Sequence, residues 1–171
     1  MIKEQFFPTT VYGKDIQLDN NTLANHIISW SKQDQGVKKT NVNGWHSTTD
    51  MHLKAEYQPL VQELYRMQEE IYQEEWLDRK PRLGNMWANI NYSGGYNRPH
   101  IHPNCLFSGV YYVKSTKESG VLVVNDPRPG IQTMMPTRKE GKPPKHLWRE
   151  AKIEPVPGRI IMFPAWLWHC V

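Results

Sequence analysis

Apolar side chains recur at helical spacing in two stretches of the first half of the chain. The first stretch follows Asp19, Asn20 and Asn21, whose side chains can cap a helix that runs through Ile27 to Trp30. The second begins near Pro59, which suits a first helical turn because that turn needs no N–H from it. Its predicted apolar face comprises Leu60, Leu64, Met67, Ile71 and Trp76 or Leu77, and its predicted solvated face comprises Glu63, Glu69, Glu70, Glu74 and Glu75.

From residue 81 onward, short runs of alternating apolar and polar residues replace the helical pattern. Such runs, bounded by Gly, Pro and polar residues, predict β-strands. Two of them, 106–113 and 120–124, are separated by a loop of hairpin length. The second half is therefore predicted to be all-β, as a sandwich or jelly roll. The other predicted segments are strands at 85–92 and 159–163, a turn at 93–95, a short strand at 6–12 interrupted by Pro8, and a loop at 36–49.

Composition narrows the class of protein but does not define its function. The chain has 171 residues, of which 39% are hydrophobic and 22% charged, as expected for one globular domain. A mean hydropathy of -0.68 and the lack of a long apolar run exclude a membrane span. The first residues carry no secretory signal pattern, and two cysteines, Cys105 and Cys170, are too few for a disulfide framework. We therefore expect a cytoplasmic protein.

Positive charge is modest in total and gathers in one segment. The formal net charge is +4 and the isoelectric point is near 9.0. Residues 127–150 are rich in Pro, Lys and Arg, which predicts either a solvated insertion or a lid over a site. No stripe of alternating aromatic and basic residues accompanies this segment, so the sequence does not favour a nucleic-acid partner.

Three of the seven histidines form a pattern that fits a metal site. His100 and His102 are flanked by prolines, which favour an extended backbone, and residues two apart in an extended chain point to the same side. His169 follows the strand predicted at 159–163. Three neutral imidazoles with open positions suit Fe(II), Zn(II) or a similar cation. The other four are interpreted as structural or exposed: His26, His46, His52 and His146.

Three segments of the second half together resemble the 2-oxoglutarate-dependent Fe(II) oxygenases, within a branch close to the prolyl hydroxylases. Residues 91–102 resemble the family's approach to its first metal motif. Residues 108–113 and 119–124 resemble its Tyr-rich strand, Gly turn and following strand. Residues 158–169 resemble its closing segment, in which a Gly, a strand and Phe-Pro precede a histidine. The resemblance covers about residues 81–171 and implies an α+β fold: a double-stranded β-helix (jelly roll) core with N-terminal helices packed on it.

The resemblance assigns His100 and His169 as iron ligands. His102 stands where the family's usual triad has a carboxylate, so we expect three histidines to hold the metal, with Asp126 as the alternative third ligand. A histidine in that position leaves the site with one negative charge fewer.

The resemblance also implies residues for the co-substrate. Tyr112 stands where the family places a tyrosine on the distal carboxylate of 2-oxoglutarate, and Tyr92 stands near its keto-acid end. The family normally continues beyond the distal histidine to an Arg or Lys that pairs with that carboxylate, so we expect a chain truncated at its C-terminus, or Lys114 in that role. The residues expected to line a substrate pocket are Trp87, Trp166, Trp168 and Arg98.

Together these patterns predict a single domain over residues 1–171, with helical support at 1–80 and a jelly-roll catalytic core at 81–171. The predicted function is a 2-oxoglutarate- and Fe(II)-dependent oxygenase that hydroxylates an unactivated C–H bond of a small-molecule or peptidyl substrate. Two alternatives stay open at this point. One is a three-histidine, cupin-like metal enzyme that does not use 2-oxoglutarate, and the other is a jelly-roll binding module without catalytic activity.

Overall fold

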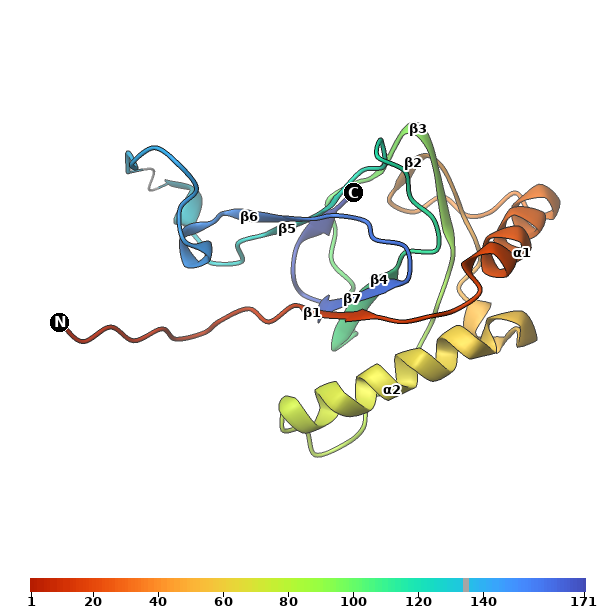
Figure 1. Ribbon diagram of the computed structural model, residues 1–171, viewed down its shortest axis with the longest axis horizontal. Helices are drawn as coiled ribbons and strands as arrows, with labels where there is room; N and C mark the ends of the chain where they lie inside the picture. Colours follow the sequence, from red (N-terminus) through yellow and green to blue (C-terminus); the bar gives the residue numbers. More distant parts are fainter. Residues whose placement is uncertain (134–135) are drawn as a thin grey trace.

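The computed structural model describes residues 1–133 and 136–171 (Figure 1). It combines two α-helices with eight short strands and four short 3-10 turns in the described ranges. The helices and strands are β1 (Tyr12–Asp15), α1 (Asn20–Gln33), β2 (Asn41–His46), α2 (Gln58–Glu74), β3 (Asn89–Asn97), β4 (Phe107–Tyr111), β5 (Leu122–Asn125), β6 (Glu150–Ile153), β7 (Arg159–Pro164) and β8 (His169–Cys170).

Both predicted helices are present. The carboxylate of Asp19 accepts a hydrogen bond of 3.0 Å from the backbone N–H of Thr22, which satisfies one free donor at the start of α1. Pro59 lies in the first turn of α2, as expected. The last position of the buried face was left open between Trp76 and Leu77, and the structure shows Leu77 half-buried and Trp76 95% exposed. The reason is that α2 ends at Glu74, and Trp76 adopts a left-handed backbone (φ 53°) that turns its side chain outward.

One sheet has the strand order β1-β7-β4 and is covered on its outer face by α2 (Figure 1). Side chains along β7 alternate between the two faces of this sheet. Ile160 packs with Met67 and Ile71 of α2, whereas Ile161 and Phe163 point into a separate core. The ion pair between Lys14 of β1 and a glutamate of α2 ties the helix to the sheet edge.

A second sheet has the strand order β6-β5-β8 and contributes to that separate core. Leu122 and Val124 of β5 pack there with Ile161 and Phe163 of β7. The two three-stranded sheets therefore face each other across one layer of buried side chains.

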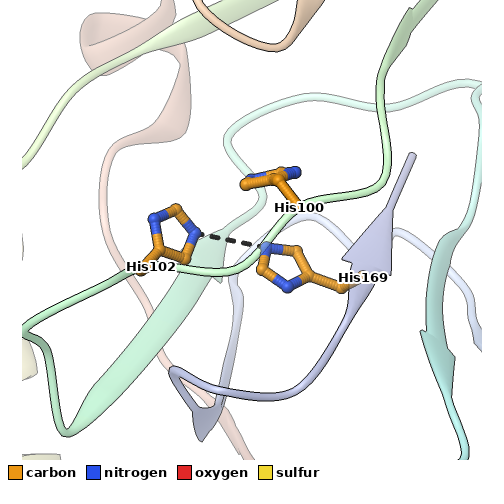
Figure 2. A group of neighbouring side chains, drawn as sticks. All are labelled: His100, His102 and His169. Carbon is orange, nitrogen blue, oxygen red and sulfur yellow. Dashed lines mark hydrogen bonds between the residues drawn. The ribbon is translucent and has the colours of Figure 1, made fainter.

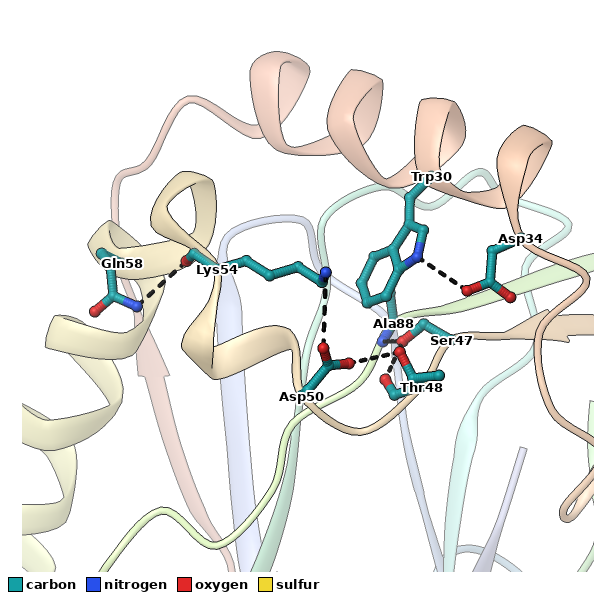
Figure 3. A network of polar contacts seen from close by, with 8 residues as sticks. All are labelled: Trp30, Asp34, Ser47, Thr48, Asp50, Lys54, Gln58 and Ala88. Atoms are coloured by element: carbon teal, nitrogen blue, oxygen red, sulfur yellow. Dashed lines mark hydrogen bonds and ion pairs between the residues drawn. The ribbon is translucent and has the colours of Figure 1, made fainter.

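A third, two-stranded sheet pairs β2 with β3 and carries α1. A polar network anchors the helix end to neighbouring loops (Figure 3). Within it, Trp30 Nε1 donates to Asp34 at 3.3 Å, and Lys54 Nζ lies 4.6 Å from the Trp30 ring and 3.7 Å from Asp50. The backbone N–H of Ala88 also donates to the Ser47 hydroxyl at 3.0 Å.

The structure corrects two expectations around β2 and β3. The predicted loop at 36–49 contains β2, and the predicted turn at 93–95 lies inside β3. The glycines in these segments, which were expected to interrupt strands, instead allow β2 and β3 to approach each other closely. A Cβ at Gly95 would lie 2.3 Å from the Asn43 carbonyl oxygen, and one at Gly44 would lie 2.8 Å from that of Ile90. A register shift between Val42 and Gly44 accompanies this approach.

Two further expectations are wrong, and one strand was not predicted. The first strand is β1 at residues 12–15 rather than 6–12, because its register partners on β7 are residues 159–162. The strands β4 and β5 do not form a hairpin. β4 pairs with β7, and β5 pairs with β6 and β8, so the connecting loop crosses from one sheet to the other. The strand β6, Glu150–Ile153, follows directly on the polar segment 127–150 and was not predicted, because only alternate residues of this short strand are shielded.

Among the described residues, no helix is both long enough and apolar enough to cross a membrane.

Candidate metal centre

Two extended segments far apart in sequence bring three histidines together. The backbones of His100 and His169 exchange two hydrogen bonds, of 3.0 and 3.1 Å, as an isolated antiparallel bridge. The N–H of His102 donates to the Ala165 carbonyl at 2.9 Å. His169 begins β8 and also lies opposite Val124 of β5. The three positions are therefore fixed by backbone pairing, independently of any ligand.

The three side chains converge on one point (Figure 2). One ring nitrogen from each histidine lies within 4.8 Å of the other two, and the Nε2 atoms of His102 and His169 are 3.2 Å apart. Two nitrogens each bonded to one ion at about 2.1 Å, with an angle of about 90–110° between them, lie about 3.0–3.4 Å apart. The His102–His169 pair already has this separation.

Hydrogen bonds to the backbone fix the orientation of two of the rings. Nδ1 of His100 lies 2.7 Å from the Arg98 carbonyl oxygen, and Nδ1 of His169 lies 2.8 Å from that of Leu167. A carbonyl only accepts, so each Nδ1 carries the proton and each Nε2 keeps a free lone pair. Metal-binding histidines commonly have such an outer partner, because it fixes the tautomer and the ring orientation.

The surroundings of the cluster favour the uncharged form of two of its imidazoles. Burial, together with the nearby charges of His169 and His100, lowers the pKa of His102 to about 4. Burial also lowers the pKa of His169. Both rings are therefore neutral at neutral pH, which is the form that binds a metal.

Asp126 does not join this cluster. Its carboxylate forms an ion pair with Arg128, with a closest distance of 2.5 Å, and this interaction lowers the pKa of Asp126. In the described parts of the chain, the group of possible metal ligands consists of the three histidines alone. The possible donor set of this cluster is thus three nitrogens with no carboxylate.

Tyr112 places a polar atom in the core beside the cluster. Its ring packs with the group that contains Phe163, and the ring of Phe163 lies 4.7 Å from that of His169. The Tyr112 hydroxyl is buried and forms no hydrogen bond with any residue that the structure describes. Burial raises the pKa of this phenol to about 12. Buried hydroxyls without a partner are rare in proteins, so this one points to a polar ligand that would complete it.

The structure separates the other predicted site residues into two groups. Trp87 lies against the cluster, with its ring centroid 5.6 Å from that of His102. Arg98 contributes its carbonyl oxygen to His100. No described contact connects the remaining four residues with the histidines, and all four have exposed side chains: Tyr92, Lys114, Trp166 and Trp168. Trp166 instead lines a surface groove of about 410 Å³ together with Phe7 and Arg128.

The sequence interpretation missed one neighbour of the site. His46, assigned to a polar loop, is buried at the end of β2, and its ring stacks on Trp87 at 5.4 Å with an interplanar angle of 9°. The stacking itself depends on pairing between residues more than forty positions apart, which no local pattern reveals.

Fold and site together define a class of protein. It is a mixed helix-and-sheet protein in which three backbone-fixed imidazoles can hold one metal ion, next to a buried hydroxyl that lacks a partner.

Comparison with known proteins gives the family. The model of the family described as "putative 2OG-Fe(II) oxygenase" matches residues 85–171, a span that includes all three histidines and Tyr112. The chain belongs to this family of 2-oxoglutarate- and Fe(II)-dependent oxygenases. It is accordingly a dioxygenase whose cofactors are Fe(II) and 2-oxoglutarate and whose substrate is a small molecule or a peptide.

A solved structure has the same fold. The crystal structure of a prolyl-4-hydroxylase from Pseudomonas putida superimposes with a TM-score of 0.63 and 14% sequence identity, covering 95% of this chain and 84% of that one. No curated protein matches the sequence significantly.

Proposed function

We propose that His100, His102 and His169 hold the catalytic Fe(II), and that the enzyme hydroxylates an unactivated C–H bond of its substrate. The observation that carries this proposal is the convergence of three histidine ring nitrogens, all within 4.8 Å of one another and two of them 3.2 Å apart. When bound, Fe(II) and 2-oxoglutarate supply the oxidising chemistry. The three imidazoles would supply part of the ligand set of the ion and leave positions open for other ligands.

The lack of a carboxylate in the triad has a defined effect. Three neutral ligands leave the full double positive charge on Fe(II), whereas a triad with one carboxylate would reduce it to a single charge. The site should therefore bind a dianion such as 2-oxoglutarate with stronger electrostatic attraction. It should also bind the metal itself less tightly, because one charged ligand is missing.

The buried hydroxyl of Tyr112 is assigned to the distal carboxylate of 2-oxoglutarate. Donation of the phenolic proton to a carboxylate oxygen would satisfy a group that otherwise lacks a partner. Lys114 is exposed and has no described contact with the core, so it is the weaker candidate for this role. The tyrosine would orient the co-substrate, and the surrounding apolar side chains would exclude water from it.

The same proposal includes the architecture. The two facing three-stranded sheets support a jelly-roll core formed by residues 81–171, to which β1 adds one edge strand, and the helices of residues 1–80 would support that core within one domain. The unpaired cysteines Cys105 and Cys170 fit the cytoplasm as the location.

An anaerobic titration tests the proposal. Fe(II) is added to the protein, then 2-oxoglutarate, and visible absorption is recorded. A weak charge-transfer band that needs both additions supports co-substrate binding at a three-histidine iron site, and the band should be lost in His102→Ala. Iron binding without the band would instead favour a three-histidine enzyme that does not use 2-oxoglutarate. A protein that binds no metal would overturn the proposal.

A further inference from the structure

The imidazole of His102 is held differently from the other two. His100 and His169 each donate from Nδ1 to a backbone carbonyl, at 2.7 and 2.8 Å. In the part of the chain that the structure describes, no group makes a hydrogen bond with Nδ1 of His102. Besides the other two histidines, the aromatic ring that contacts it is Trp87, at 5.6 Å and an interplanar angle of 42°.

Trp87 is itself firmly placed. The ring of His46 stacks almost parallel on it, at 5.4 Å and 9°. His46 is only 5% exposed, and its Nδ1 lies 2.6 Å from the Ser47 carbonyl oxygen. Ser47 in turn forms two hydrogen bonds of 3.0 Å with Ala88, the residue that follows Trp87. The Ser47 N–H donates to the Ala88 carbonyl, and the Ala88 N–H donates to the Ser47 hydroxyl. The rings of His46, Trp87 and His102 therefore form one column that leads from β2 to the metal centre.

An imidazole that rotates freely loses side-chain entropy when it binds a metal, and this loss weakens binding. A ring that no hydrogen bond orients from its outer nitrogen therefore needs another restraint. Packing against a fixed ring supplies such a restraint by limiting the side chain to one rotamer. We propose that Trp87, held in place by His46, is a positioning residue that orients the imidazole of His102 for metal binding. This inference rests on the proposed function of the three histidines.

The test measures metal binding by the ligand-free, full-length protein, with Co(II) as a spectroscopic probe and calorimetry for the dissociation constant. Loss of an outer partner of a metal ligand typically costs about 10–100-fold in affinity. We expect Trp87→Leu to weaken Co(II) binding by about tenfold and to change the visible spectrum, and His46→Leu to act in the same direction. Trp87→Phe, which keeps an aromatic ring, should stay within about threefold of wild type. Trp76→Leu is the matched control, because that tryptophan is 95% exposed, and it should leave binding unchanged.

Repeating the Trp87→Leu substitution in a His102→Ala variant distinguishes an effect on the orientation of His102 from general damage to the fold. In His102→Ala there is no imidazole left to orient, so adding Trp87→Leu should cause no further loss of Co(II) affinity. A loss that persists in this background would overturn the inference, as would wild-type affinity and spectrum in a folded Trp87→Leu protein. If Trp87→Leu does not fold, His46→Leu decides the question by the same criteria. A wild-type protein that fails to bind Co(II) would overturn the proposed metal site itself, which is a distinguishable result.

Discussion

Replacing Tyr112 by Phe should stabilise the ligand-free protein while weakening its hold on 2-oxoglutarate. The hydroxyl is buried and unpaired, and leaving such a group without a partner costs about 1–3 kcal/mol. Removing it should therefore raise the free energy of unfolding by about that amount. For a chain of this size, 1 kcal/mol corresponds to about 2–4 °C, so the melting temperature should rise by several degrees.

A neighbouring tyrosine provides the matched control. The hydroxyl of Tyr111 donates to Asn20 at 2.5 Å, so Tyr111→Phe removes a hydrogen bond and should lower the free energy of unfolding by about 1 kcal/mol. The same chemical change at adjacent positions should thus have opposite signs.

Two assays check this pair of effects. Thermal unfolding of the metal-free proteins, followed by circular dichroism, gives the stability of each variant. Calorimetric titration of 2-oxoglutarate into protein loaded with Mn(II) gives the affinity, which Tyr112→Phe should lower by about tenfold if one hydrogen bond to a charged group is lost. A destabilised Tyr112→Phe protein would refute the assignment of an unpaired hydroxyl, and unchanged affinity would refute its role toward the co-substrate.

Other expectations follow from the cluster and its surroundings. The pKa of His102 is lowered to about 4 in the folded protein, so between pH 6.5 and pH 4 the unfolded chain binds more protons than the folded one. The urea concentration at the unfolding midpoint of the metal-free protein should therefore decrease as the pH is lowered from 6.5 to 4. This decrease should be smaller in His102→Ala. Asp126→Asn should leave the Co(II) dissociation constant unchanged, since that carboxylate pairs with Arg128; a marked loss would restore it as a ligand. Gly95→Ala should destabilise by about 1–3 kcal/mol or prevent folding in a denaturation assay, because its Cβ would lie 2.3 Å from a carbonyl oxygen, whereas Gly84→Ala, with nothing within 4 Å, should be neutral.

The sequence predicted those elements that depend only on residues close together in the chain. The cap at Asp19, the proline near the start of α2 and the apolar run of β7 depend on neighbours within a few residues, and all three are present in the structure. The grouping of the three histidines was also predictable, because flanking prolines and a preceding strand restrict the backbone on either side.

The remaining features depend on contacts between distant segments. Gly44 and Gly95 have the composition of turn residues, yet they allow close approach between β2 and β3. The loop after β4 has hairpin length, yet it connects two different sheets. The burial of His46 beneath Trp87 likewise depends on pairing that brings β2 next to residues 86–89. No periodicity within one segment encodes such choices of partner.

The proximity of His102 and His169 has a consequence for the life of the protein in the cell. A single ion bound by these two residues would connect positions 67 residues apart, and only in the folded chain. Such an ion stabilises the folded state by an amount that grows with the concentration of free metal relative to its dissociation constant, about 2.7 kcal/mol at a hundredfold excess. When iron is scarce, this stabilisation disappears, and the population of unfolded chains open to proteolysis rises. Iron supply would then govern the abundance of the enzyme as well as its turnover.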